Sequence, residues 1–190
     1  MSDDAAVRIS VSDLDTWEVW ALQSGEHATA AEHLAFLAEQ VGPASEVPRV
    51  ELLVRSGEQW ELAEEHERAL ATYRTAAADG REAILDPRAL QIGPLFHLGH
   101  THEARRLLTV LDAEGPRNLP THIAVVESLY AHGHLAMARD WGTTGYTRFQ
   151  SQNVSPFIHN LLQSLLRTRY RVGVDLGLPE DDLDRLITDT

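Results

Sequence analysis

Histidine is the residue type whose number and position in this sequence could support chemistry. The chain of 190 residues contains 10 histidines, and most stand where one helix would turn into the next: His27, His66, His100, His102, His132 and His134. If these turns align along one edge, neighbouring histidines could bind a transition metal or respond to pH near neutrality. No two histidines are four residues apart, and neither Glu-x-x-His nor His-Glu-x-x-His occurs. We therefore expect no cofactor, with a metal site or pH sensor at His100, His102, His132 and His134 as the alternative.

The composition of the chain excludes several classes of function. A formal net charge of −13 argues against nucleic acid or an anionic membrane as the partner, since both attract clustered positive charge, and favours a basic partner. Arginine supplies all 16 positive side chains, so no lysine is present for a phosphate-binding loop or a Schiff base. Cysteine is absent, which excludes thiolate metal sites and cysteine nucleophiles. Without a signal peptide or a long apolar run, the sequence predicts a cytoplasmic protein that is not an enzyme.

The elements that carry the histidines are predicted to be repeated helical hairpins. A small residue recurs at intervals of about 34 to 39 residues, as in helical repeats: Ala30, Ala69, Ala104 and Ala138. Glycine stands five positions before three of these alanines, at Gly25, Gly99 and Gly133. Glycine there can adopt φ > 0 and end one helix, while alanine lets the next helix approach closely. Each repeat is therefore expected to be an antiparallel helix pair, with Glu64 replacing the turn glycine of the second.

The clearest copy of the repeat is similar to a known family of helical hairpins. It reads Leu53-x-x-Ser56-Gly57-x-x-Trp60 and then Ala69-x-x-x-Tyr73-x-x-Ala76, which resembles the tetratricopeptide pattern of small and aromatic residues. The resemblance implies an all-α, tetratricopeptide-like α-solenoid of about four degenerate hairpins at residues 12–145, following an N-terminal tail at 1–11. A loop at 146–154 and a C-terminal capping helix with a short terminal helix, at 155–190, complete the predicted organisation.

Proline and N-cap residues predict where the helices begin. Proline is favoured in the first turn of a helix, and it occurs at or near the first turn of five of the helices expected here: Pro48, Pro87, Pro120, Pro156 and Pro179. Asp86 and Ser155 precede two of these prolines and are expected to be N-caps. The stretch from Val7 to Val11 alternates like a strand but is too isolated to be expected to pair.

The helix that begins at Pro156 has an apolar stripe that requires a covering surface: Phe157, Ile158, Leu161, Leu162, Leu165 and Leu166. Such a stripe is expected to cover the last hairpin, and pairing with a second copy in a homodimer is the alternative. The stretch from Arg169 to Asp184 looks like the C-terminal part of actinobacterial tetratricopeptide proteins. Some of those carry a cysteine-rich SEC-C segment, which this chain lacks.

The resemblance also indicates a binding surface, because the first helix of each tetratricopeptide hairpin lines a concave face. The corresponding positions here are acidic with apolar and aromatic interruptions: Asp15, Val54, Glu58, Glu61, Phe96, His97, Glu127 and Tyr130. Such a face favours a peptide or protein surface that carries basic residues beside apolar anchors. The expected function is therefore an adaptor or protein-interaction module, with the histidine-edge sensor and the homo-oligomeric scaffold as alternatives.

Overall fold

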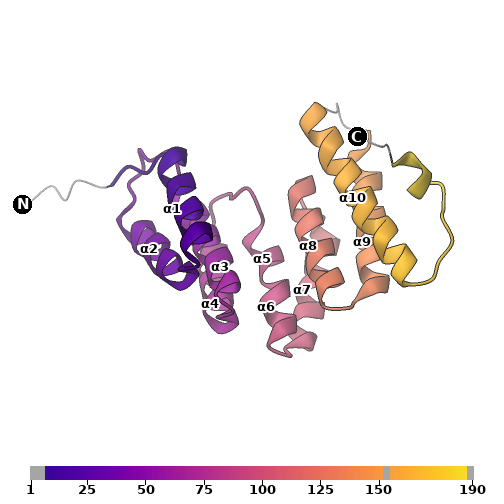
Figure 1. Cartoon of the computed structure of the whole chain (residues 1–190), viewed down its shortest axis with the longest axis horizontal. Coiled ribbons are helices and arrows are strands. Elements are labelled where there is room, and N and C mark those ends of the chain that lie inside the picture. Colours follow the sequence, from indigo (N-terminus) through magenta and orange to yellow (C-terminus); the bar gives the residue numbers. More distant parts are fainter. Residues whose placement is uncertain (1–6, 152–154, 188–190) are drawn as a thin grey trace, which may run out of the picture. The chain divides into compact units, whose positions relative to one another are not determined.

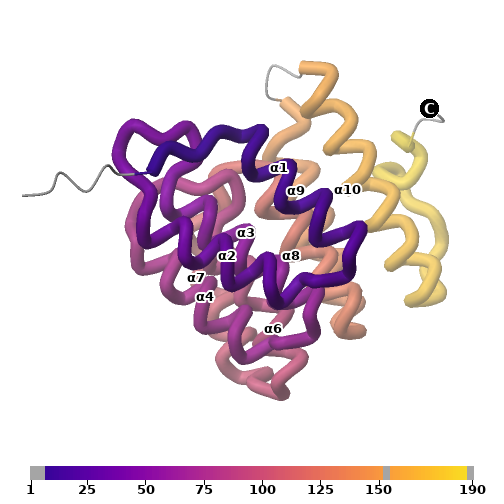
Figure 2. The backbone as a smooth tube through the Cα atoms, turned by 60° about the vertical axis from the view of Figure 1, so that its left-hand side comes forward, coloured from indigo at the N-terminus to yellow at the C-terminus, as the bar shows by residue number. Residues whose placement is uncertain are grey.

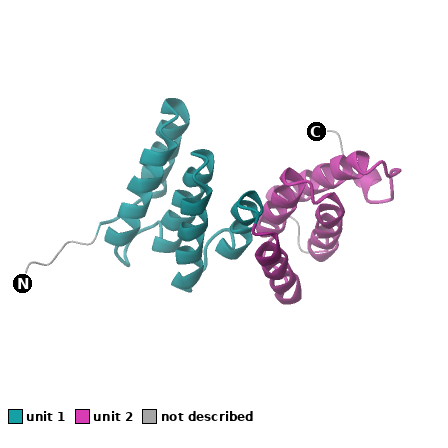
Figure 3. Ribbon diagram, turned by 90° about the horizontal axis from the view of Figure 1, so that it is seen from below, with its two compact units in different colours: residues 1–99 teal, residues 100–190 magenta. Residues whose placement is uncertain are grey.

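The computed structural model describes residues 7–151 and 155–187, and within them the chain is all-helical and contains no strand. The all-α prediction is thus confirmed. The chain divides into two compact units, unit 1 at residues 1–99 and unit 2 at residues 100–190 (Figure 3). The boundary between Gly99 and His100 falls inside the third predicted hairpin.

Unit 1 consists of helices packed against their neighbours in the sequence (Figure 1). They are α1 (Val11–Ser24), α2 (His27–Gln40), α3 (Arg49–Leu62), α4 (His66–Asp79), α5 (Pro87–Leu90) and α6 (Ile92–His97). Helix α3 is central, since it packs against both α2 and α4. Its buried face includes Val50, Leu52, Leu53 and Val54, which form one core with residues of α1 and α2.

The turns of unit 1 follow the predicted pairing of a left-handed residue with a buried alanine. Gly25 ends α1 with φ of 74°, and Ala30 of α2 is fully buried. Glu64 takes the same role after α3 with φ of 60°, and Ala69 of α4 is fully buried. Both alanines therefore allow the close helix contact for which they were singled out.

The segment before α1 is paired, which corrects two expectations from the sequence. Val7 forms an isolated parallel bridge with Val41, and its amide donates to the carbonyl of Gln40 at 3.0 Å. Ile9 is buried, and its carbonyl accepts from the amide of Val47. The strand-like stretch is thus not too isolated to pair, and residues 7–10 are not a tail. The remaining part of the predicted tail, residues 1–6, lies outside the described residues.

The first helix of the third predicted hairpin is broken into α5 and α6 at Gln91. Pro94 explains the break, because a proline cannot donate to the carbonyl four residues earlier and its ring clashes with that carbonyl. Asp86 caps α5 by accepting from the amide of Arg88 at 2.9 Å, as predicted for an N-cap.

Unit 2 consists of α7 (Thr101–Glu114), α8 (Leu119–Ala131), α9 (Leu135–Phe149), α10 (Pro156–Asp175) and a short 3₁₀ helix, η1 (Asp184–Leu186). Helix α10 packs along α9 and α8, and Figure 2 lets the reader follow this packing. Leu162, Leu165 and Leu166 are buried there, so most of the predicted stripe covers the preceding helices, although Phe157 is 66% exposed. Ser155 caps α10 as predicted.

Two boundaries in unit 2 differ from those predicted. Helix α9 continues through Phe149, so the predicted loop at 146–154 is shorter, and its residues 152–154 lie outside the described residues. Phe149 is buried, which explains why the helix continues. The predicted terminal helix from Pro179 is only the 3₁₀ turn of η1, because the Asp181 carboxylate accepts from the amides of Leu183 and Asp184 and closes a local turn. In the described part of the chain, no helix is both long and apolar enough to cross a membrane.

Candidate functional site

Unit 1 contains a hollow of ≈ 510 Å³ beside the central helix α3. Its lining comes from α1, the start of α2 and the second half of α3: Glu18, Leu22, His27, Arg55, Glu58, Gln59, Glu61 and Leu62. Residues 55, 58, 59 and 62 follow one another at the spacing of one helix face, so α3 supplies a continuous wall. We call this feature the unit 1 hollow.

A single guanidinium lies among several carboxylates in the unit 1 hollow. Arg55 contacts Glu58 on the next turn at 3.1 Å, Glu51 on the preceding turn at 3.2 Å and Glu18 of α1 at 3.4 Å. Burial raises the pKa of Glu58, and Arg55 only partly opposes this effect. Burial also raises the pKa of Glu18, again against the charge of Arg55. One arginine therefore does not neutralise the carboxylates that surround it.

Among the carboxylates that line the unit 1 hollow, Glu61 has the most strongly shifted pKa. Burial raises its pKa to about 7, although a hydrogen bond from the Tyr73 hydroxyl at 3.1 Å to its Oε2 opposes the shift. Tyr73 reaches Glu61 from α4 by lying across Gly57, where a Cβ would be 2.3 Å from the tyrosine ring. The glycine of the repeat motif thus makes room for the tyrosine that orients Glu61.

The rim of the unit 1 hollow is apolar and open to solvent. Leu22 of α1 is 76% exposed and Leu62 of α3 is 59% exposed, so both present most of their side chains to a potential partner. A hydrogen bond of 2.8 Å between His27 Nδ1 and Gln59 Oε1 joins the start of α2 to α3 within the lining. The hollow thus combines acidic groups with exposed aliphatic surface.

The structure separates the predicted partner-binding residues of unit 1 into two groups. Glu58 and Glu61 line the hollow, and Asp15 is exposed on α1, where its charge contributes to raising the pKa of Glu18. Val54 is 1% exposed and belongs to the core, so its prediction as a contact residue is wrong. Phe96 of α6 is also buried and unavailable to a partner.

The other predicted partner-binding residues do not join this site. His97 is exposed, and its ring stacks on that of His66 with centroids 3.5 Å apart. In unit 2, Glu127 is exposed on α8. Tyr130 donates from its hydroxyl to Asp175 Oδ2 at 2.7 Å, which ties α8 to the end of α10.

The histidine edge is not assembled as a metal site. Among residues 7–151 and 155–187, no group of three or more histidine, cysteine, aspartate or glutamate side chains is placed to hold an ion. His132 instead uses Nδ1 in a 2.8 Å contact with the Ser128 carbonyl. Burial, together with the charges of Arg105 and His132, lowers the pKa of His134. His100, which precedes α7, and His102 in its first turn are both exposed.

Two charged residues of the unit 1 hollow, Glu18 and Arg55, were not identified from the sequence. Arg55 stands four residues after Glu51 and three before Glu58, and these helical spacings were a usable signal for a local ion-pair cluster. Glu18 carries no such signal, because it reaches Arg55 only through the packing of unit 1.

No known protein family, no curated protein and no solved structure matches this chain. The inference of function therefore depends on the chemistry of its own side chains.

Proposed function

We propose that this chain is a non-catalytic protein-interaction module of tetratricopeptide-like hairpins, and that the unit 1 hollow binds a basic segment of another protein. The observation that carries the proposal is the uncompensated acidity of the hollow. Glu18, Glu58 and Glu61 line it together with a single arginine. An incoming guanidinium or ammonium group would therefore meet partly buried carboxylates that have only one arginine, Arg55, among them.

Two carboxylates of α3 are suited to such a cation. Glu58 uses Oε2 to contact Arg55, and Glu61 uses Oε2 to accept from Tyr73. Their Oε1 atoms remain available on adjacent turns of one helix. A planar guanidinium, which carries several donors, can bridge two acceptors placed in this way.

The exposed leucines define the second part of the proposed ligand. Leu22 and Leu62 belong to the lining of the hollow, so an aliphatic side chain next to the basic residue would cover them. Burying such apolar surface contributes roughly 25 cal/mol per Å². The proposed ligand is thus a segment with arginine beside leucine-sized residues, and its specificity comes from the arginine.

Neutralising the two carboxylates tests this function directly. The full chain and its Glu58→Gln/Glu61→Gln variant are titrated into the fluorescein-labelled peptide Gly-Arg-Leu-Ala-Arg-Leu-Ala-Arg-Leu-Gly, and binding is measured by fluorescence polarisation. We expect the variant to bind about tenfold more weakly, because two charge-assisted contacts are lost. A Glu67→Gln/Asp140→Asn variant makes the same change in net charge at exposed sites and should bind within about twofold of the wild type.

The same titration at two pH values adds an independent readout. Because the pKa of Glu61 is about 7, more of this carboxylate is charged at pH 8 than at pH 6, and wild-type affinity should rise between them. A Glu61→Gln variant should lose most of this rise. Equal binding of a peptide with citrulline in place of each arginine would refute the proposed function, since citrulline has the same shape without the charge.

A further inference from the structure

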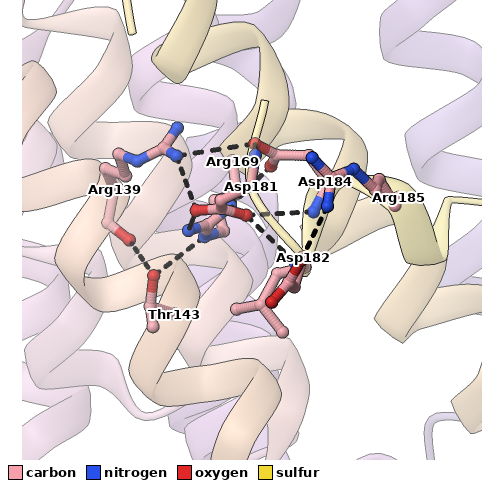
Figure 4. A network of polar contacts seen from close by, with 8 residues as sticks. Arg139, Thr143, Arg169, Asp181, Asp182, Asp184 and Arg185 are labelled. Atoms are coloured by element: carbon pink, nitrogen blue, oxygen red, sulfur yellow. Dashed lines mark hydrogen bonds and ion pairs between the residues drawn. The ribbon is translucent and has the colours of Figure 1, made fainter. Parts of the chain in front are cut away.

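Unit 2 contains a pair of arginines buried between two helices (Figure 4). The Arg139 side chain of α9 is 13% exposed, and the Arg169 side chain of α10 is 4% exposed. Thr143 of α9 positions Arg169 by accepting from its Nε at 2.8 Å. Two guanidinium groups are thus held close together in a largely dry environment.

Each of these arginines lies over a glycine of the opposite helix. A Cβ on Gly173 of α10 would be 2.0 Å from Arg139 Nη1, and a Cβ on Gly142 of α9 would be 3.2 Å from the Cβ of Arg169. This arrangement explains why Gly142 stands where the repeat pattern has an aromatic residue. The packing of α9 on α10 therefore positions both guanidinium groups. The residues that follow α10 do not position the arginines; they supply only the acidic groups that bind to them.

The bound groups are two carboxylates from residues 178–187, which we call the clasp. Asp181 spans the pair, with Oδ2 at 2.8 Å from Arg139 Nη2 and Oδ1 at 3.0 Å from Arg169 Nη1. Asp184 contributes Oδ1 to Arg169 Nη1 at 2.5 Å. The amide of Asp181 donates to Asp184 at 3.1 Å, so the clasp folds into a compact turn that presents both carboxylates to the arginines.

Polar contacts, rather than apolar packing, attach the clasp. Within residues 178–187 only Asp184 is buried, while Leu178 and Leu186 are each 46% exposed. One further tie is the hydrogen bond of 3.2 Å from Gln163 Nε2 to the Leu186 carbonyl. A segment held in this way can be displaced by a competitor that supplies equivalent carboxylates.

One guanidinium nitrogen of the arginine pair makes no hydrogen bond with the clasp. Arg139 Nη1 is buried and makes no hydrogen bond. A ligand with one more acceptor would therefore bind better than the clasp does. Acid is a poor trigger for release, because the hydrogen bond with Arg169 holds the pKa of Asp181 far below its usual range.

We propose that Arg139 and Arg169 form a binding site for acidic Asp-x-x-Asp segments of a partner protein, and that the clasp occupies this site until such a segment displaces it. A second copy of the chain is a weaker competitor. Its clasp offers the same contacts, but the chain's own clasp is tethered and so has an effective concentration in the millimolar range. A partner gains by satisfying Arg139 Nη1 and by adding contacts of its own. The site belongs to unit 2 and does not depend on the unit 1 hollow.

The test uses the full chain with the clasp carboxylates neutralised. The Asp181→Asn/Asp184→Asn variant is titrated into a fluorescein-labelled peptide with the sequence of residues 178–187. We expect the variant to bind this peptide at least about tenfold more tightly than the wild type does, because the clasp occupies the site of the wild type. We also expect the variant to bind this peptide at least about tenfold more tightly than it binds a peptide with asparagine at both positions. The matched control is Asp182→Asn, because the Asp182 side chain is 97% exposed and pairs with Arg185 instead of the arginine site.

The proposal is overturned if the variant keeps its helical circular dichroism but binds the two peptides equally well. If the variant loses helicity, amide hydrogen exchange of the wild type decides the question. Excess acidic peptide should speed exchange at residues 181–187 while α9 and α10 stay protected, and unchanged exchange overturns the proposal. Sedimentation tests whether the ligand is instead a second copy of the chain. If the wild type forms a concentration-dependent dimer that Asp181→Asn abolishes, the ligand is a second copy, and the proposal of an acidic segment from a partner protein is overturned.

Discussion

Glu64 ends α3 in a backbone conformation that glycine adopts at much lower cost. Its φ of 60° is the only positive φ of a non-glycine residue in the described chain, whereas Gly25, Gly99 and Gly133 occupy the corresponding turns. The turn itself is well formed, because the Glu65 amide donates to the Trp60 carbonyl at 2.9 Å. A left-handed conformation costs an ordinary residue roughly 1–2 kcal/mol, so this turn stores strain that the other turns avoid.

Replacing Glu64 by glycine should stabilise unit 1. We expect the free energy of unfolding to rise by about 0.5–1 kcal/mol, because relief of the left-handed strain exceeds the entropy that glycine adds to the unfolded chain. Urea unfolding monitored by circular dichroism measures the change. Glu64→Ala removes the same charge and side chain but keeps the strain, so it should bring no comparable gain. Equal stabilisation by both variants would assign the effect to charge instead.

Individual residues also show how much of the predicted binding face could be located from the sequence. Glu58 and Glu61, two residues of that predicted face, line the unit 1 hollow. Val54 and Phe96 were assigned to the same face but are buried. The sequence gives the spacing of residues along a helix but not the rotation of that helix about its axis. That rotation is set by tertiary packing, and so is the approach of Glu18 to Arg55.

At the scale of elements, α8, α9 and α10 enclose a histidine that has no polar partner. His122 of α8 is fully buried, and neither ring nitrogen makes a hydrogen bond. Trp141 and Phe149 of α9 lie beside it, with ring centroids 5.3 Å and 5.6 Å away. Burial lowers the pKa of His122 to about 4; the charge of Arg148 contributes to this shift and that of Asp112 opposes it.

This histidine should make the packing of α8 sensitive to acid. Its pKa is near 6.5 in the unfolded chain and about 4 in the folded one, so the unfolded state binds a proton first as the pH falls. Stability is therefore complete above about pH 6.5 and declines by roughly 3 kcal/mol towards pH 4. In urea unfolding, His122→Leu should weaken this decline and the exposed His159→Leu should not. A free-energy difference between wild type and His122→Leu that stays constant from pH 7 to 4.5 would contradict the prediction.

The helices that could be predicted best are those whose ends depend on local chemistry. Proline and N-cap signals located the starts of α3, α5, α8 and α10, because capping involves residues only two or three positions apart. The end of α9 and the pairing of Val7 were missed. Burial of Phe149 and the bridge to Val41 both depend on contacts distant in sequence. Pro94 was a local signal for the break between α5 and α6. The break was not predicted, because the repeat period indicated one continuous helix there.

At the scale of the whole molecule, unit 1 contains clusters of buried side chains drawn from several of its helices. One cluster joins Ile9 and Leu34 to α3, and another joins Trp60 of α3 to Tyr73 of α4. Unit 2 has a different internal organisation, in which α10 packs on α8 and α9 and the clasp binds the arginine pair. Compact units of one chain can open with different free energies.

We therefore expect the two units to unfold in separate transitions. Hydrogen exchange measured by mass spectrometry at increasing urea concentrations can follow peptides from residues 7–99 and 100–187 independently. Glu64→Gly should shift only the first transition, because its strain lies in a turn of unit 1. Lowering the pH from 7 to 5 should shift the second transition through His122, and His122→Leu should reduce that shift. If both substitutions moved one common transition by their full effects, the two units would unfold as a single cooperative structure, and the prediction of separate transitions would be wrong.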